Sequence, residues 1–265
     1  MDQHRPVAAI TGASSGIGEV FALKLAERGY DLLLIARRKD RLDALGLELS
    51  RAHDAGCESL PADLANERDV VRVADRLKAE PRLAMLVNNA GFGVRGRFVR
   101  SPVEEQERMH KVHVMATVRL THAALVEMVA RDSGAIINVA SVAAYARSQG
   151  NVSYCATKSW MTVFTEALHL ELKGTGSHVR VQALCPGFTH SEFHDTMGVD
   201  KTSIGASLWL NADAVVEASL RGLERGKLFV VPGFTYKLVT AIMPKLPASL
   251  RIWVELRNPQ SKGRV

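Results

Sequence analysis

The sequence predicts an α/β protein with one doubly wound, Rossmann-like parallel sheet of about seven strands and helices on both faces. Short apolar runs alternate with longer segments of helical spacing along most of the 265 residues, which is the order expected of strand–helix–strand units. Residues 32–36 are apolar without alternation, as in a strand that is covered on both faces. A glycine-rich turn at residues 11–18 joins the first strand to the first helix. In such a sheet the ligand crevice lies at the carboxyl ends of the strands.

In chain order, each expected strand is a short apolar run, and each expected helix has apolar residues three and four apart. The first strand, residues 7–10, ends in the glycine-rich turn, and Gly29 stops the helix at 19–28. The second strand is expected at 32–36, and a short third strand is expected to end near residue 61. The later strands are expected at 83–87, 135–140, 179–184 and 228–231. The later helices are expected at about 40–53, 67–78, 103–131, 153–173 and 212–225.

The chain is expected to form a single domain over residues 1–265, because no repeat, low-complexity segment or linker divides it. An apolar and basic extension follows at about 234–265, where Pro244 and Pro247 prevent one long helix. Two roles are favoured for it, a subunit contact or a cap over the substrate cleft. Attachment to a membrane surface through residues 234–256 is the less favoured third. We expect a homodimer or homotetramer.

The composition is that of an ordinary globular protein, with 47% apolar and 23% charged residues. The net charge is +6, but Lys and Arg are mixed with carboxylates, so we expect a solvated basic surface and no nucleic-acid partner. Cys57, Cys155 and Cys185 cannot all pair and lack metal-ligand spacing, which indicates free thiols in a reducing compartment. No signal peptide and no run of 18 apolar residues occurs. We therefore expect a cytoplasmic protein.

The turn Thr11-Gly12-Ala13-Ser14-Ser15-Gly16-Ile17-Gly18 predicts a dinucleotide site. Glycines allow a sharp turn, close approach of a pyrophosphate and tight packing of helix against strand. The amino terminus of the following helix offers free N–H groups and the positive end of its dipole to the phosphates.

The end of the second strand indicates which dinucleotide binds. An NAD site has an acid there for the ribose 2′-hydroxyl, whereas this chain has Arg37-Arg38-Lys39. Arginine can hold a 2′-phosphate through two hydrogen bonds. We therefore expect NADP(H), bound by Arg37 and secondarily by Arg38, and we interpret Lys39 as a solvated charge.

The glycine spacing resembles that of the short-chain dehydrogenase/reductase family, and further family motifs follow in order over about residues 5–232. These motifs are Asn88-Asn89-Ala90-Gly91, Ser141, Tyr154-Cys155-Ala156-Thr157-Lys158 and Pro186-Gly187. The resemblance implies that Asp63 and Leu64 contact the adenine and that residues 186–189 border the nicotinamide. The cofactor contacts implied in all are Gly12, Ser14, Ser15, Gly16, Ile17, Gly18, Asp63, Leu64, Asn89, Ala90, Gly91, Tyr154, Lys158, Pro186, Gly187 and Thr189.

Tyr154 and Lys158 are four residues apart on a predicted helix and therefore share one face. A phenol is a poor base at neutral pH, whereas a nearby ammonium and the positive nicotinamide ring of the oxidised cofactor both favour the phenolate. We therefore expect these two cations together to lower the pKa of Tyr154. By resemblance, Tyr154 gives a proton to the carbonyl oxygen in reduction and removes it in oxidation. Ser141 holds the substrate oxygen, and Lys158 also binds the nicotinamide ribose. Hydride transfer of this kind requires no metal.

His113 stands where many members of this family carry an asparagine that holds a water beside the catalytic lysine. Its imidazole can donate and accept, which suits a proton relay. It can equally be a packed residue that fills the helix core. Both readings stay open, and the relay is slightly favoured because the matching position in relatives is polar.

The segment after Pro186 usually covers the substrate in this family. Here it provides Phe193, Met197, Leu208 and Trp209, with no Arg or Lys between Pro186 and Asp200. An apolar enclosure favours a hydrophobic ketone or aldehyde over a phosphorylated or dicarboxylate substrate.

Two other functions compete with this carbonyl–alcohol oxidoreductase. A catalytically weak NADP-binding sensor or scaffold is favoured by His113 but opposed by the complete set of Ser141, Tyr154 and Lys158. A sugar epimerase or dehydratase usually has a longer chain with a distinct carboxy-terminal domain.

Overall fold

The structure, a computed structural model, describes residues 5–94, 96–192 and 205–257. Seven strands, all paired in parallel, form one sheet in the order β3-β2-β1-β4-β5-β6-β7. The strands are β1 (Val7–Thr11), β2 (Asp31–Ala36), β3 (Cys57–Pro61), β4 (Leu83–Asn88), β5 (Ala135–Val139), β6 (Arg180–Leu184) and β7 (Phe229–Val230). The predicted fold class is confirmed. The strand order reverses at β1, which pairs with both β2 and β4, and ligands of such sheets bind at this switch point.

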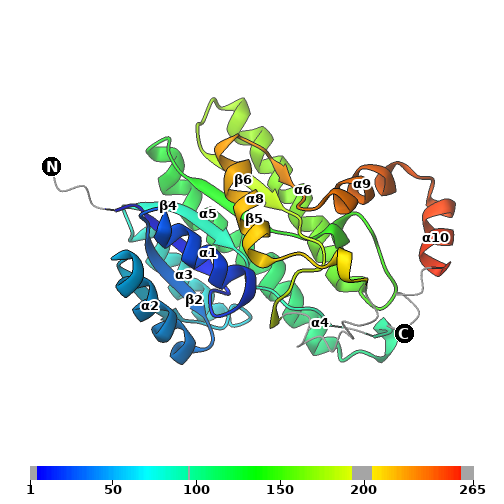
Figure 1. Cartoon of the computed structure of the whole chain (residues 1–265), viewed down its shortest axis with the longest axis horizontal. Coiled ribbons are helices and arrows are strands. Elements are labelled where there is room, and N and C mark those ends of the chain that lie inside the picture. Colours follow the sequence, from blue (N-terminus) through cyan, green and yellow to red (C-terminus); the bar gives the residue numbers. More distant parts are fainter. Residues whose placement is uncertain (1–4, 95, 193–204, 258–265) are drawn as a thin grey trace.

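The helices cover both faces of the sheet (Figure 1). The α-helices are α1 (Gly16–Glu27), α2 (Lys39–His53), α3 (Glu67–Lys78), α4 (Val103–His110), α5 (Thr117–Ala130), α6 (Val152–Gly174), α8 (Ala212–Glu224), α9 (Phe234–Ile242) and α10 (Ala248–Arg257). The shorter turns are η1 (Phe98–Arg100), the π-helical η2 (Lys111–Ala116), η3 (Val142–Ala144), η5 (Ala206–Leu208) and η6 (Met243–Lys245).

Two apolar cores lie on opposite sides of the sheet because successive side chains of a strand point to opposite faces. In β1, Ala8 and Ile10 face the core that contains α1, α2 and α8. Val7 and Ala9 face the core that contains α3, α5 and α6. This two-sided burial is why the strands read as continuous apolar runs in the sequence.

The predicted helix at 103–131 is continuous in space, but its middle is a π-helical turn, η2. Such turns inside α-helices occur frequently at functional sites, and this one carries His113. The segment Val103–Ala130 is also long and apolar enough to cross a membrane by length and composition alone. Half of its most apolar window is buried in the protein, where α5 packs against α3 and the sheet, as a core helix does.

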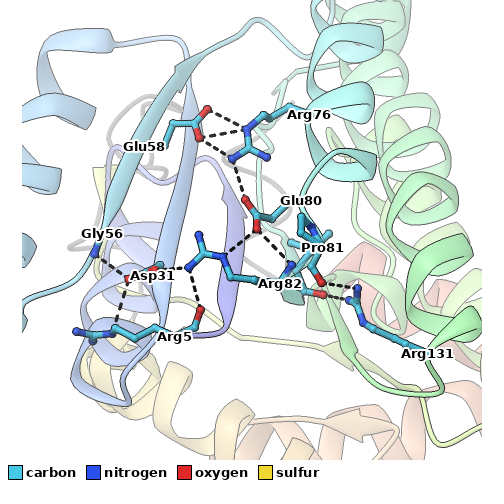
Figure 2. Close-up of polar contacts among 10 residues, drawn as sticks. Arg5, Asp31, Gly56, Glu58, Arg76, Glu80, Pro81, Arg82 and Arg131 are labelled. Carbon is cyan, nitrogen blue, oxygen red and sulfur yellow. Dashed lines mark hydrogen bonds and ion pairs between the residues drawn. The ribbon is translucent and has the colours of Figure 1, made fainter. Parts of the chain in front are cut away.

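A network of charged side chains lies at the end of the sheet where the parallel strands begin (Figure 2). Glu80 is buried and paired with Arg76 at 2.9 Å and with Arg82 at 3.2 Å. Arg82 also pairs with Asp31 at 2.8 Å, at the start of β2. These arginines and acids bind one another, so much of the basic character of this edge is already neutralised.

Candidate active site

The glycine-rich turn between β1 and α1 has the backbone geometry that a bound pyrophosphate requires. Gly12 and Gly16 have φ of +67° and +59°, values that side-chain-bearing residues rarely adopt. A Cβ on Gly18 would lie 2.2 Å from the Gly12 carbonyl oxygen, so only glycine lets the helix approach the turn. Ser15 occupies the N-cap of α1 without a side-chain capping hydrogen bond. The first N–H groups of α1 therefore suit an anionic ligand, and the turn fits a dinucleotide.

The loop after β4 holds this turn in place. The Thr11 hydroxyl oxygen accepts hydrogen bonds from the Asn89 N–H at 2.9 Å and the Ala90 N–H at 3.0 Å. The Asn89 side-chain amide donates in return to the Thr11 carbonyl oxygen at 2.9 Å. Asn88 points into the sheet and donates to Asn138 on β5 at 2.9 Å. The motif at 88–91 thus joins β1, β4 and β5 at the switch point.

Of the two predicted phosphate-binding arginines, the structure brings Arg38 onto the glycine-rich turn. The Arg38 guanidinium donates to the Ser14 hydroxyl at 3.0 Å and to the Ser14 carbonyl oxygen at 3.2 Å. The side chain of Arg37 is exposed and makes no hydrogen bond or ion pair with the rest of the described chain. These contacts concern the protein alone, so the expectation that Arg37 binds the 2′-phosphate, with Arg38 secondary, stays a prediction.

Asp63 and Leu64 follow β3, at the edge of the same crevice. Leu64 is buried, and the Asp63 carboxylate accepts a hydrogen bond from Arg108 at 2.7 Å. Burial raises the pKa of the Asp63 carboxyl, but hydrogen bonds from the Ala65 N–H and Arg108 and the nearby charge of Arg37 outweigh it and hold the pKa below its usual value. Asp63 is therefore anionic at neutral pH.

Ser141, Tyr154 and Lys158 converge beside this crevice. Tyr154 and Lys158 lie in the first turns of α6, and Ser141 follows the end of β5. Tyr154 is hydrogen-bonded to the Ser141 side chain. The Lys158 Nζ is buried, donates to the Val139 carbonyl oxygen at 2.7 Å and lies 5.9 Å from the centroid of the Tyr154 ring. The expected spatial grouping of the three side chains is thus present.

Burial governs the ionisation of Tyr154 and Lys158. Burial raises the pKa of Tyr154 to about 12, and the hydrogen bond with Ser141 offsets this only in part. Burial also lowers the pKa of Lys158 to about 8. The expected lowering of the Tyr154 pKa involves both Lys158 and the oxidised nicotinamide, so it stays a prediction for the chain with its cofactor. Within the described chain, burial is the largest influence on the pKa of each group.

His113 lies fully buried between the loop after β4 and helix α6. Its Nε2 accepts a hydrogen bond from the Phe92 N–H at 3.1 Å, and its Nδ1 lies 2.9 Å from the Thr157 hydroxyl oxygen. The Thr157 hydroxyl donates onward to the Tyr154 carbonyl oxygen at 3.0 Å. Burial, with a smaller contribution from the charge of Lys158, holds the pKa of His113 well below its usual value. The ring is therefore neutral, with its proton on Nδ1, and both nitrogens contact partners within the chain.

Helix α9 of the carboxy-terminal extension lies against the segment that follows β6. The Tyr236 hydroxyl accepts from the Phe188 N–H at 3.1 Å and donates to the Leu208 carbonyl oxygen at 2.6 Å. Its ring lies so close to Gly187 that a Cβ there would be 2.1 Å away. One side chain thus holds both ends of the segment expected to cover the substrate.

The expected apolar enclosure is described in part. Trp209 stacks on His190, with ring centroids 4.9 Å apart, and tilts against Phe188 at 5.7 Å. Phe193 and Met197 lie outside the described residues.

Sequence reasoning missed several residues that organise this site. Arg108 and Tyr236 were not singled out, and Thr11 and Thr157 stood inside predicted motifs without a role of their own. Only proximity in the fold reveals the contacts that these four side chains make. Gly91 lies so close to His113 that a Cβ on it would be 2.7 Å from Nε2, a contact that the sequence does not signal.

Comparison with known proteins places the chain in a family. Residues 6–201 match the family model of the short chain dehydrogenases. The chain belongs to this family. It is thus an oxidoreductase of the short-chain type, with a nicotinamide dinucleotide as its class of cofactor.

Relatives of this short-chain dehydrogenase have varied or unassigned substrates. An uncharacterized oxidoreductase of Staphylococcus epidermidis is 31% identical over 83% of this chain and 91% of its own length. Sulfoacetaldehyde reductase 2 of Chromohalobacter salexigens is 36% identical over 69% of this chain and 73% of its own length.

Two solved structures are similar over nearly the whole chain. A short-chain dehydrogenase of Sphingobium yanoikuyae, in complex with NADPH, is 34% identical, has a TM-score of 0.83, and matches 98% of this chain and 100% of its own. The bulky-bulky ketone specific alcohol dehydrogenase of Comamonas testosteroni is 29% identical, with a TM-score of 0.79 and 96% coverage of each chain.

Proposed function

We propose that this short-chain dehydrogenase uses NADP(H) to interconvert a hydrophobic ketone or aldehyde and the corresponding alcohol. The observation that carries the proposal is the convergence of Ser141, Tyr154 and Lys158 beside a glycine-rich turn suited to a dinucleotide. A proton donor, a hydrogen-bonding hydroxyl and a cation in one partly dry cleft are what carbonyl reduction requires.

Each side chain has one assigned task. Tyr154 donates the proton of its hydroxyl to the substrate oxygen during reduction and removes it during oxidation, while Ser141 holds that oxygen. Lys158, held by the Val139 carbonyl oxygen, places positive charge near Tyr154 and is within the same cleft to bind the nicotinamide ribose. The cofactor, when bound, supplies or accepts the hydride.

The raised pKa of Tyr154 favours reduction at neutral pH. With a pKa of about 12 the phenol is protonated and ready to donate. Oxidation of an alcohol needs the phenolate, which the positive charge of Lys158 and of the oxidised nicotinamide both stabilise. Alcohol oxidation should therefore speed up as the pH rises above neutrality, and carbonyl reduction should not.

We assign the choice of NADP(H) to Arg38 together with Arg37 and Ser14. Arg38 lies on the glycine-rich turn at Ser14, and Arg37 is free of ion pairs within the described chain. No acid follows β2 to accept the 2′-hydroxyl that NAD carries. The similar Sphingobium yanoikuyae structure contains NADPH, which supports this choice.

The proposed substrate is apolar because the described start and end of the covering segment present Phe188, Leu208 and Trp209. The similar alcohol dehydrogenase of Comamonas testosteroni is specific for bulky-bulky ketones, which supports a hydrophobic substrate. The sulfonate of sulfoacetaldehyde, by contrast, would need a cationic partner, and no Arg or Lys occurs between Pro186 and Asp200.

An activity screen with both cofactors tests the proposal. We expect turnover of apolar ketones or aldehydes, and NADPH binding at least tenfold tighter than NADH, about 1.4 kcal/mol. Tyr154→Phe should lower turnover by about 10²–10⁴-fold and spare NADPH binding, whereas Lys158→Ala should damage both. Arg38→Ala and Arg37→Ala should each reduce the difference in binding affinity between NADPH and NADH. Near-normal turnover by Tyr154→Phe would contradict the proposal, and so would equal affinities of the wild-type protein for NADPH and NADH.

We further propose that the chain acts in the cytoplasm as one domain over residues 1–265, as a homodimer or homotetramer and without nucleic acid. The contacts of Tyr236 support a role for the start of the extension in capping the substrate side.

A further inference from the structure

The carboxylate of Glu192, which is distant in sequence, lies beside Arg38, one of the arginines proposed to bind the cofactor. Glu192 lies just beyond β6, and its Oε2 is 3.0 Å from the Arg38 Nη1 while its Oε1 is 2.6 Å from the Arg41 Nη1. Arg38 precedes α2 and Arg41 lies in its first turn. Glu192 is 154 residues from Arg38 and 151 from Arg41 in the sequence, so only the fold brings the carboxylate to the two arginines.

The position of this carboxylate is fixed by its neighbours. The Cβ of Ser191 would be 2.8 Å from a Cβ on Gly16, so the segment lies directly over the start of α1. Arg38 uses its Nε and Nη2 on Ser14 and its Nη1 on Glu192. The guanidinium group nearest the glycine-rich turn is thus shared between the turn and an acid.

A 2′-phosphate and Glu192 would need the same donors. The phosphate is a dianion that binds arginine most strongly through two hydrogen bonds. Two anions beside one guanidinium repel each other, so binding of the phosphate requires Arg38 to release Glu192. The nicotinamide cofactor without that phosphate makes no such demand.

We propose that Glu192 is a specificity-determining residue that competes with the 2′-phosphate of NADP(H) for Arg38 and Arg41 and so weakens NADP(H) binding selectively. The inference rests on the proposed function, because it requires NADP(H) to bind at Arg38. Arg41 thereby joins the phosphate site, although nothing in its place in the sequence marked it. The affinity for NADP(H) is set by the balance between two arginines and one internal acid.

Glu192→Gln tests the competition because it keeps the shape of the side chain and removes its charge. Dissociation constants are measured for NADPH and NADH, and for the fragments 2′,5′-ADP and 5′-AMP. We expect NADPH and 2′,5′-ADP to bind about three- to tenfold more tightly to the variant, the scale of one or two exposed ion pairs. NADH and 5′-AMP should change less than about twofold.

Glu217→Gln is the matched control, since Glu217 on α8 is also paired with two arginines, Arg28 at 2.9 Å and Arg221 at 3.6 Å. It should leave all four constants unchanged. In an Arg38→Ala background, Glu192→Gln should gain much less for NADPH. Glu192→Ala, which removes the carboxylate by another route, should reproduce the gain if the Gln variant folds poorly.

Two results would overturn the inference. Unchanged or weaker NADPH binding by both Glu192 variants would show that the carboxylate does not compete. A loss of NADH affinity would show instead that Glu192 serves the ribose 2′-hydroxyl. The proposed function fails separately, if the wild-type protein shows no preference for NADPH or if Arg38→Ala leaves that preference intact.

Discussion

At the scale of single residues, Lys158 carries a charge into a site from which water is largely removed. Its pKa falls from 10.5 to about 8 because burial disfavours the ammonium. At neutral pH the side chain is still mostly charged, as binding and catalysis require. The site therefore keeps a cation at a cost in folding stability, which is common where function and stability compete.

This cost predicts a pH dependence of stability. Between pH 8 and 10.5 the unfolded chain binds a proton at Lys158 that the folded chain does not. The folding stability of the wild type, relative to Lys158→Met, should therefore rise with pH by roughly 3 kcal/mol in total across that window. Denaturant unfolding of both proteins at pH 7.5, 9 and 10.5 measures the difference. A constant difference would show that Lys158 titrates in the folded chain as it does in water.

The contacts of His113 favour one of the two roles that the sequence left open. Both ring nitrogens contact partners within the chain, Phe92 and Thr157, and Thr157 in turn holds the backbone at Tyr154. We propose that His113 is a positioning residue that fixes the loop after β4 relative to α6, in place of a proton relay.

Substitution of His113 separates these roles. His113→Leu removes the acceptor of the Phe92 N–H and the donor to the Thr157 hydroxyl oxygen, although Thr157 keeps its bond to the Tyr154 carbonyl oxygen. It should therefore destabilise the fold by about 1–3 kcal/mol. His113→Gln, which keeps an amide within reach of these groups, should recover part of that loss. Thermal midpoints and turnover, measured together, test this. A Leu variant with an unchanged midpoint but slow turnover would favour the relay.

At the scale of elements, the carboxy-terminal extension divides into two helices of different character. Helix α9 buries Tyr236 against the segment after β6, whereas α10 buries no residue. In Figure 1 both helices lie at the opposite end of the molecule from α2. Helix α9 therefore suits the cap over the substrate cleft, whereas α10 is the part of the extension that is open to a subunit contact or a membrane surface.

Tyr236→Phe tests the role of α9. The variant keeps the ring over Gly187 but leaves the Phe188 N–H and the Leu208 carbonyl oxygen without this partner. We expect KM for the carbonyl substrate to rise about three- to tenfold, equivalent to roughly 1 kcal/mol, with little change in the Kd of NADPH. Thr235→Ala, an exposed position on the same helix, is the control. An unchanged KM would mean that the hydroxyl does not shape the substrate cleft.

At the scale of the whole molecule, α5 and α6 leave apolar side chains in solvent. Val118, Val126 and Val129 are exposed on α5, and Val163 and Leu170, 64% and 66% exposed, lie on α6. Exposed apolar side chains along these two helices favour association between copies of the chain.

Sedimentation should therefore show a dimer or tetramer, and Val163→Glu combined with Leu170→Glu should shift it toward the monomer. The control is Leu256→Glu on α10, which is 56% exposed. If the control disrupts the assembly and the α6 variant does not, the extension forms the subunit contact.

The sequence by itself determined the parallel sheet, the glycine-rich turn and the pairing of Tyr154 with Lys158. Each of these depends on residues close together in the chain, where periodicity and fixed spacing reflect the local backbone geometry. Burial of the strands on both faces of the sheet followed from the same alternation of elements, whereas the order of the strands is known only from the structure.

Only the tertiary structure decided the burial of Tyr154, the contact of Arg38 with Ser14, and the contacts of Glu192 and Tyr236. The direction of a pKa shift depends on how much water surrounds a group, and this is set by packing from distant segments. Contacts between residues about 150 positions apart leave no periodic trace in the chain. These side chains act together because the crossovers of the sheet bring the ends of separate strands to a single edge.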